Sequence, residues 1–162
     1  MKKIITLFLL LFNFAFSNSL GLTPIDIIIL KKIKSLTDDN YMKYTLMAIA
    51  IKESSVGKKL INPISNDYGL FQSNIKSVIR RQKVPDTMFN RQYFAKKLVY
   101  DVGFSTANAI VEIDFWRKVH KDNWIKIWAS YNTGWQYKSD TGLEYATSVF
   151  DIIKKLKFEY DL

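Results

Sequence analysis

The sequence predicts a mainly α-helical domain with at most a very small β-sheet. Apolar residues recur at helical spacing along most of the 162 residues, and capping residues, glycine or proline interrupt them at short intervals. Only residues 67–72 combine a turn with a short extended piece. A chain of this length is one domain on size grounds and can bury its own core.

Residues 1–17 have the composition of a secretory signal peptide. Lys2 and Lys3 precede an apolar run from Ile4 to Phe12, and small residues follow. We expect cleavage after Ser17 or, as a second choice, after Ser19. The run is short for a membrane span, although it could act as an uncleaved anchor. The prediction is a periplasmic or secreted bacterial protein with its folded domain at 22–162.

Helices are expected on either side of a long loop. The first begins near Pro24 and ends before Thr37. Thr37 to Asp39 offer the N-cap and first-turn acids of the second. Its expected inner face carries Tyr41, Tyr44, Met47, Ala48 and Ile51. Residues 56–66 contain Gly57 and Pro63 and predict the loop that forms the floor and rim of a cleft.

The second half of the chain predicts shorter helices and one long terminal helix. A short helix spans 74–81, Asp86 is expected to cap the next, and Gly103 to end it. Ser105 or Thr106 then begins a helix through Trp116, and Asp122 caps another that runs to Tyr131. The last helix is expected over about 141–156. The residues expected on apolar faces are Met88, Phe89, Phe94, Leu98, Val99, Ile110, Ile113, Trp116, Trp124, Ile127, Trp128, Tyr145, Val149, Ile152 and Ile153.

Charge and composition narrow the possible functions. The formal net charge is +9, falling to +7 without Lys2 and Lys3, which suits nucleic acid, anionic lipid or bacterial cell wall. No nucleic-acid-binding motif accompanies the charge, so we expect no nucleic-acid partner. The absence of cysteine excludes a cysteine nucleophile and a cysteine zinc cluster. His120 is the only histidine, and no metal or cofactor is predicted.

Glu53 is the candidate catalytic acid. It closes the apolar stretch that begins at Tyr44, where desolvation would raise its pKa and hold a proton near neutral pH. A helix C-terminus disfavours a negative charge, so a purely structural glutamate is poorly placed there. Asp67 has two equally supported interpretations. It could be a second catalytic carboxylate, or it could form a turn in which its side chain binds the backbone of Gly69.

These residues resemble the catalytic core of lytic transglycosylases of the soluble lysozyme-like (SLT) superfamily. The resemblance rests on Glu53-Ser54, Ser65-Asn66-Asp67-Tyr68-Gly69, Gly69-Leu-Phe-Gln72, Ser130-Tyr131-Asn132-Thr133-Gly134 and Tyr145, in that order. It covers about residues 38–157 and implies a lysozyme-like fold. The chain looks most similar to small, single-domain members associated with secretion systems and pili, which implies a component of such a machine as a possible partner.

The resemblance and side-chain chemistry together indicate substrate-binding residues. Gln72, Asn74 and Asn132 have amides that can hold sugar hydroxyl or acetamido groups, and Tyr131 can stack on a sugar or pack beneath Trp128. The family uses the equivalent of Tyr145 to bind the catalytic glutamate, although this position also suits the core. Trp135 lies in the loop after Gly134 and is the tryptophan expected to meet substrate.

The predicted function is cleavage of the β-1,4 bond between N-acetylmuramic acid (MurNAc) and N-acetylglucosamine (GlcNAc). In the transglycosylase route Glu53 is acid and then base, and the product ends in 1,6-anhydro-MurNAc. In the lysozyme route Asp67 serves as the second carboxylate and water completes the reaction. A non-catalytic peptidoglycan-binding assembly protein is a third possibility, which the presence of Glu53 disfavours.

Overall fold

The computed structural model describes residues 19–160 and 162, so the predicted signal peptide lies outside the described part of the chain. The described residues contain seven α-helices, one 3-10 helix and three very short strands, joined by loops. In chain order they are α1 (Pro24–Lys34), α2 (Asn40–Ser54), β1 (Ile61–Asn62), β2 (Asp67–Tyr68), β3 (Ser73–Asn74), α3 (Ile75–Gln82), α4 (Met88–Tyr100), α5 (Val102–His120), α6 (Trp124–Thr133), η1 (Gly134–Gln136) and α7 (Asp140–Glu159). The mainly helical prediction is confirmed.

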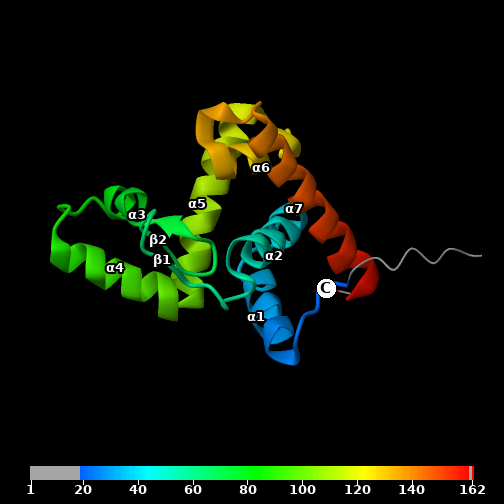
Figure 1. The fold of residues 1–162 in the computed structure, drawn as a ribbon, viewed down its shortest axis with the longest axis horizontal. Helices are drawn as coiled ribbons and strands as arrows, with labels where there is room; N and C mark the ends of the chain where they lie inside the picture. The colour runs from blue at the N-terminus through cyan, green and yellow to red at the C-terminus, as the bar shows by residue number, and fades with distance from the viewer. Residues whose placement is uncertain (1–18, 161) are drawn as a thin grey trace, which may run out of the picture.

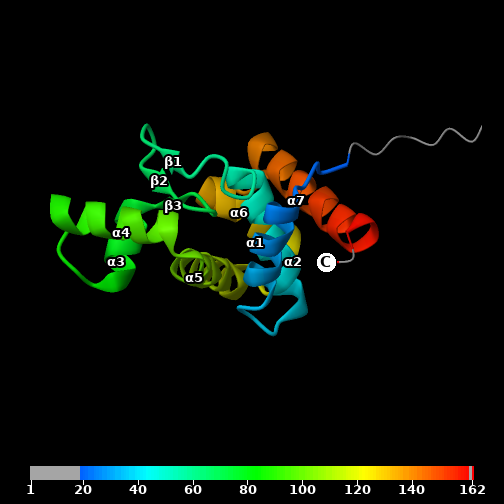
Figure 2. The ribbon, with the colours of Figure 1, turned by 90° about the horizontal axis from the view of Figure 1, so that it is seen from below.

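The helices divide the molecule into two parts, with α5 between them. In both ribbon views α3 and α4 lie on one side, and α1, α2, α6 and α7 lie on the other (Figure 1 and Figure 2). Each part has its own buried cluster. The larger includes Leu46, Met47 and Ile49 of α2, all fully buried, and the smaller consists of Ile75, Val78, Ile79, Phe94 and Leu98.

Side-chain caps explain where most helices begin. Thr23 and Asp26 form a reciprocal capping box at α1, and the Asp39 carboxylate accepts from the backbone of Met42 at α2. Three predicted starts are wrong by a few residues. Thr87 rather than Asp86 caps α4, Asn123 rather than Asp122 caps α6, and Asp101 caps α5, so Gly103 lies inside its first turn.

The two displaced aspartates form ion pairs instead. Asp86 contacts Arg91 at 2.6 Å, and Asp122 contacts Arg117 at 2.9 Å. Arg91 lies near the start of α4, whereas Arg117 lies in the last turn of α5. The neighbouring Thr87 and Asn123 accept from the first backbone N–H groups of α4 and α6, and both residue types cap well.

Three apolar positions predicted to face inward are exposed. Tyr41 is 68% exposed and stacks on Trp124, whereas Met88 and Phe89 at the start of α4 are each 75% exposed. The three positions lie in the first turns of α2 and α4, where the rest of the described structure leaves these side chains largely exposed. Within the same residues, no helix combines the length and apolarity needed to cross a membrane.

The strands form a small antiparallel sheet in the order β1-β2-β3, with Asp67 opposite both Asn62 and Asn74. Residues 69–72 turn between β2 and β3, so the expected extended piece at 67–72 is strand only at 67–68. Gly69 has φ +83°, and a Cβ there would lie 2.3 Å from the Leu98 carbonyl oxygen. Only glycine lets this turn pack directly against α4.

Candidate active site

Glu53 lies at the C-terminal end of α2 and is half-buried. The helix stops directly after it because Ser55 and Val56 adopt left-handed conformations, with φ of 51° and 57°. The chain therefore leaves α2 sharply, and Glu53 lines two hollows together with Gln72 of the turn at 69–72. This is the position predicted for a catalytic acid.

Ser54 ties the end of α2 to that turn. Its buried hydroxyl donates to the carbonyl oxygens of Ala50 and Leu70, at 3.1 and 2.9 Å, and accepts from the backbone of Gly57 at 3.0 Å. One side chain thus links α2, the following loop and the Gly69–Gln72 segment. The Glu-Ser pair of the predicted motif has a structural reason, which is that the serine fixes the glutamate relative to the cleft wall.

Two tyrosine hydroxyls approach the same region from α6 and α7. Tyr145 donates to Oε1 of Glu53 at 2.5 Å, and Tyr131 donates to the carbonyl oxygen of Phe71 at 2.9 Å. Burial, followed by the charge of Glu53, raises the pKa of both phenols well above their ordinary value. Both hydroxyls therefore stay protonated and act as donors. Tyr131 is partly buried and packs against the larger core, which is one of its predicted roles, and it also lines the cleft, where stacking on a sugar stays a prediction.

The surroundings of Glu53 raise its pKa above the ordinary value of 4.5. Burial is the largest cause, and the nearby charge of Asp67 acts in the same direction. The hydrogen bond from Tyr145 and the charge of Lys52 oppose them but are weaker in sum. A carboxyl group that holds its proton at higher pH is suited to protonate a leaving oxygen.

A polar cleft of about 250 Å³ opens beside this glutamate. It collects side chains from both parts of the fold: Glu53, Asp67, Gln72, Ser73, Asn74, Ser77, Arg81, Glu112, Tyr131 and Asn132. Five residues predicted from sequence to contact substrate or serve as the second carboxylate therefore line one cleft with Glu53. Tyr145 reaches the site through its hydrogen bond to that glutamate.

Asp67 is held by a neighbouring side chain rather than by its own turn. Its Oδ1 accepts from Nδ2 of Asn74 at 2.9 Å, whereas the backbone N–H of Gly69 donates to Leu60. The predicted Asp67–Gly69 hydrogen bond is therefore wrong. The carboxylate instead lines the cleft beside Glu53 and influences its pKa.

The side-chain amides of Gln72 and Asn74 shape the cleft wall. Gln72, with φ +46°, donates from Nε2 to the carbonyl oxygens of Lys59 and Gly69, each at 3.0 Å. Asn74 caps α3 through its oxygen and donates to Ser65 and Asp67 through its nitrogen. Both donor groups are thus engaged within the protein, and the Gln72 carbonyl is the end of that amide left to face the cleft.

Asn132 and Trp135 occupy different places although both lie near the C-terminal end of α6. Asn132 is exposed and lines the cleft. Trp135 is 68% exposed but is absent from the cleft lining, and its ring packs edge-on against Trp116 at 5.0 Å and Phe115 at 6.3 Å. The structure therefore does not bring Trp135 to the residues around Glu53.

Arg81 and Glu112 are cleft residues that the sequence did not reveal. The Arg81 guanidinium contacts the carboxylate of Glu112 and the side-chain oxygen of Asn108, joining α3 to α5. Glu112 also accepts from Nε1 of Trp116 at 3.0 Å. Glu112 and Trp116 are one helical turn apart, which was visible in the sequence, but the pairing with Arg81 spans 31 positions and had no local signal.

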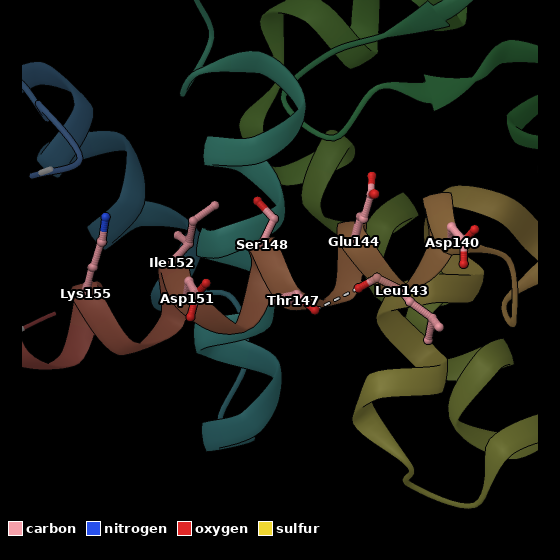
Figure 3. Close-up of a pocket in the computed structure, with 8 residues that line it drawn as sticks. All are labelled: Asp140, Leu143, Glu144, Thr147, Ser148, Asp151, Ile152 and Lys155. Atoms are coloured by element: carbon pink, nitrogen blue, oxygen red, sulfur yellow. Dashed lines mark hydrogen bonds between the residues drawn. The ribbon is translucent and has the colours of Figure 1, made fainter. Parts of the chain in front are cut away.

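Two of the other hollows on the described surface differ in their relation to Glu53. One, a groove of about 720 Å³, shares Glu53 and Gln72 with the cleft and continues along residues 57–63 to Val99 and Tyr100. The other, of about 610 Å³, is an open depression formed entirely by α7, from Asp140 to Lys155 (Figure 3). It contains none of the predicted site residues, so we place the active site at the cleft and groove that meet at Glu53.

Comparison with known proteins identifies the family of the chain. Residues 32–148 match the Transglycosylase SLT domain family. An uncharacterized 20.7 kDa protein from the vs-regB intergenic region of enterobacteria phage T4 is 30% identical over 116 residues. That similarity covers 70% of this chain but only 62% of the phage protein. No solved structure matches the chain significantly. The chain belongs to the transglycosylase SLT domain family, whose members are lytic transglycosylases that cleave glycosidic bonds as lyases.

Proposed function

We propose that this protein is an exported peptidoglycan lytic transglycosylase that cleaves the MurNAc–GlcNAc β-1,4 bond. The observation that carries the proposal is the environment of Glu53, which is half-buried, bonded to Tyr145 and placed where the cleft and the groove meet. A carboxyl group with a raised pKa that lines both the cleft and the groove suits an acid that acts on a bond of a polymer occupying the two.

In the proposed reaction Glu53 serves first as acid and then as base. Its proton passes to the glycosidic oxygen as the bond to C1 of MurNAc breaks, which leaves a carboxylate and an oxocarbenium-like sugar. The carboxylate then removes the proton of the C6 hydroxyl of the same sugar, and O6 bonds to C1. The 1,6-anhydro ring closes, Glu53 regains its proton, and no water is consumed.

The tyrosines support these two roles differently. Tyr145 donates to Oε1 of Glu53 and so stabilises the carboxylate formed after the first proton transfer. Tyr131 donates to Phe71 and holds the cleft wall in place, so its role is one of positioning. Gln72, Asn132 and, through the wall it builds, Asn74 are the proposed contacts for sugar hydroxyl and acetamido groups. Trp135 lies outside the cleft lining, so in this proposal it would contact only sugars distant from the cleaved bond.

A hydrolytic, lysozyme-type reaction is the second candidate because Asp67 lines the same cleft as Glu53. In that case Asp67 would stabilise or attack the sugar and water would complete the reaction. The hydrogen bond from Asn74 fixes the carboxylate without neutralising it. This geometry is compatible with an electrostatic role in either route.

Digestion of purified cell wall followed by mass analysis tests the proposal. An anhydro end weighs one water less than a reducing end, so fragment masses separate the two reactions. We expect anhydro ends from the wild type and loss of at least about a hundredfold in rate for Glu53→Gln, within the range typical of an acid–base catalyst. Near-normal cleavage by a folded Glu53→Gln protein would overturn the assignment, and reducing ends would favour hydrolysis.

The Asp67→Asn variant distinguishes the transglycosylase reaction from the hydrolytic one. In the one-carboxylate route it slows the reaction and leaves the anhydro product unchanged. If the wild-type product instead has reducing ends and Asp67→Asn is as inactive as Glu53→Gln, Asp67 is the second carboxylate. Asparagine preserves an oxygen that can accept from Asn74, so the wall should remain intact.

Export is proposed from residues 1–17 alone. N-terminal sequencing of the protein from cells is expected to find Asn18 or, as the second choice, Leu20. A soluble cytoplasmic protein that retains Met1 would contradict export. A partner in a secretion system or pilus remains a prediction from the resemblance, since neither the family match nor the phage relative concerns a partner.

A further inference from the structure

The two depressions that meet at Glu53 differ in charge. The cleft is lined by Glu53, Asp67 and Glu112, and its one basic residue, Arg81, is engaged with Glu112 and Asn108. The groove is lined by Lys58 and Lys59, and Glu53 is the one acid among its lining residues. A ligand that crosses Glu53 therefore meets acidic side chains in one direction and basic side chains in the other.

The lysines are held near the active site by their backbone and by one ion pair. The backbone N–H of Lys59 donates to the carbonyl oxygen of Ser54 at 3.0 Å, and its own carbonyl oxygen accepts from Gln72 at 3.0 Å. Lys59 is therefore anchored beside the residue that follows Glu53, while its side chain is exposed. Lys58 pairs with the buried carboxylate of Asp26 at 3.2 Å, which offsets part of its charge.

Apolar and aromatic side chains complete the groove. Leu60 and Val99 are partly buried, whereas Ile61 and Tyr100 are 59% and 79% exposed. An exposed tyrosine and two lysines that line one groove offer an apolar surface and positive charge to the same ligand. Neutral sugars alone do not need that charge, so the groove suits an acidic, partly apolar chain.

We infer that this groove binds the acidic stem peptide that each muramic sugar carries, and this inference rests on the proposed function. When a MurNAc lies at Glu53, its peptide begins within a few bonds of the reacting carbon. The carboxylates of the cleft repel the carboxylates of that peptide, and Lys59 attracts them. The peptide therefore leaves the glycan toward residues 57–63 and Tyr100, and the enzyme prefers peptide-bearing strands over bare ones.

The test compares two substrates made from the same wall: intact strands and strands stripped of peptides by an amidase. Lys59→Gln removes the charge but keeps the backbone anchors, and Lys32→Gln on the exposed face of α1 is the charge-matched control. On intact strands we expect Lys59→Gln to lower kcat/KM about two- to fivefold, mainly through KM, as for an exposed ion pair. Tyr100→Ala is expected to act in the same direction.

On stripped strands each muramic sugar keeps only its lactyl carboxylate, so we expect Lys59→Gln to lose less activity than on intact strands and Lys32→Gln to match the wild type. Added salt should abolish the difference on intact strands. Equal losses for Lys59→Gln on both substrates, or no loss on intact strands, would overturn the inference. Failure of the proposed function is separate, because it appears as absence of anhydro ends from the wild type on both substrates.

Discussion

The Tyr145 hydroxyl donates to Oε1 of Glu53 at 2.5 Å, joining residues 92 positions apart at the centre of the active site. The bond crosses from α7 to the end of α2, so the position of the acid depends on how these two helices pack. Because the phenol stays protonated, it always offers the glutamate a donor. This donor favours the charged form of Glu53, whereas burial favours the neutral form.

Tyr145→Phe is expected to lower kcat by about tenfold to a hundredfold, the worth of one hydrogen bond to a charged group. Loss of this donor also raises the pKa of Glu53 further, so the alkaline limb of the kcat/KM profile moves to higher pH. Rates of wall cleavage measured across pH check both effects. Tyr41→Phe, on the exposed face of α2, is the control and should change neither.

Asp67→Asn and Lys52→Gln are expected to move the alkaline limb in opposite directions. The charge of Asp67 raises the pKa of Glu53, so its removal lowers that pKa and activity is lost at lower pH. The charge of Lys52 lowers the pKa of Glu53, so its removal extends activity to higher pH. The measurement is the pH profile of kcat/KM for each variant. If the alkaline limb moved in the same direction in both variants, Glu53 would not be the catalytic acid.

Glu53→Gln is expected to raise the free energy of unfolding above about pH 4.5. Burial raises the pKa of Glu53 from its ordinary 4.5, so between the two values the folded protein holds a proton that the unfolded chain has lost. Wild-type stability therefore falls as pH rises through this window, and the variant avoids that loss. Urea titrations at several pH values should show no gain well below pH 4.5 and a constant gain above the raised pKa.

Gly69→Ala is expected to destabilise the fold by about 3 kcal/mol or more, because strain at positive φ adds to overpacking. A Cβ there meets the Leu98 carbonyl oxygen at 2.3 Å and Ser105 Oγ at 2.8 Å. Gly134→Ala is the matched control, since its φ is also positive but nothing lies within 4 Å of its Cβ. Denaturant unfolding should show the larger loss at Gly69, and equal losses would refute the proposed close approach.

The sequence predicted the parts of the fold and site that depend on local chemistry. Periodicity and caps located the helices to within a few residues, and the Glu53-Ser54 and Gly69–Gln72 segments identified both sides of the cleft. The exposure of Met88 and Phe89 could not be predicted. Helical spacing shows which face of a helix is apolar but not whether another element covers that face. Arg81 and Glu112 were missed because only the tertiary fold brings them together.

The separate hydrophobic clusters have a consequence for how the cleft keeps its shape. Ile75, Val78, Ile79, Phe94 and Leu98 form a core of their own on one side, and the core around α2 and α7 lies on the other. Apolar contacts join the two sides as well as the Arg81–Glu112 ion pair, since Phe94 of α4 stacks on Phe104 of α5 at 5.9 Å. The position of the α3–α4 wall of the cleft relative to Glu53 and Tyr145 therefore depends on how α4 packs against α5.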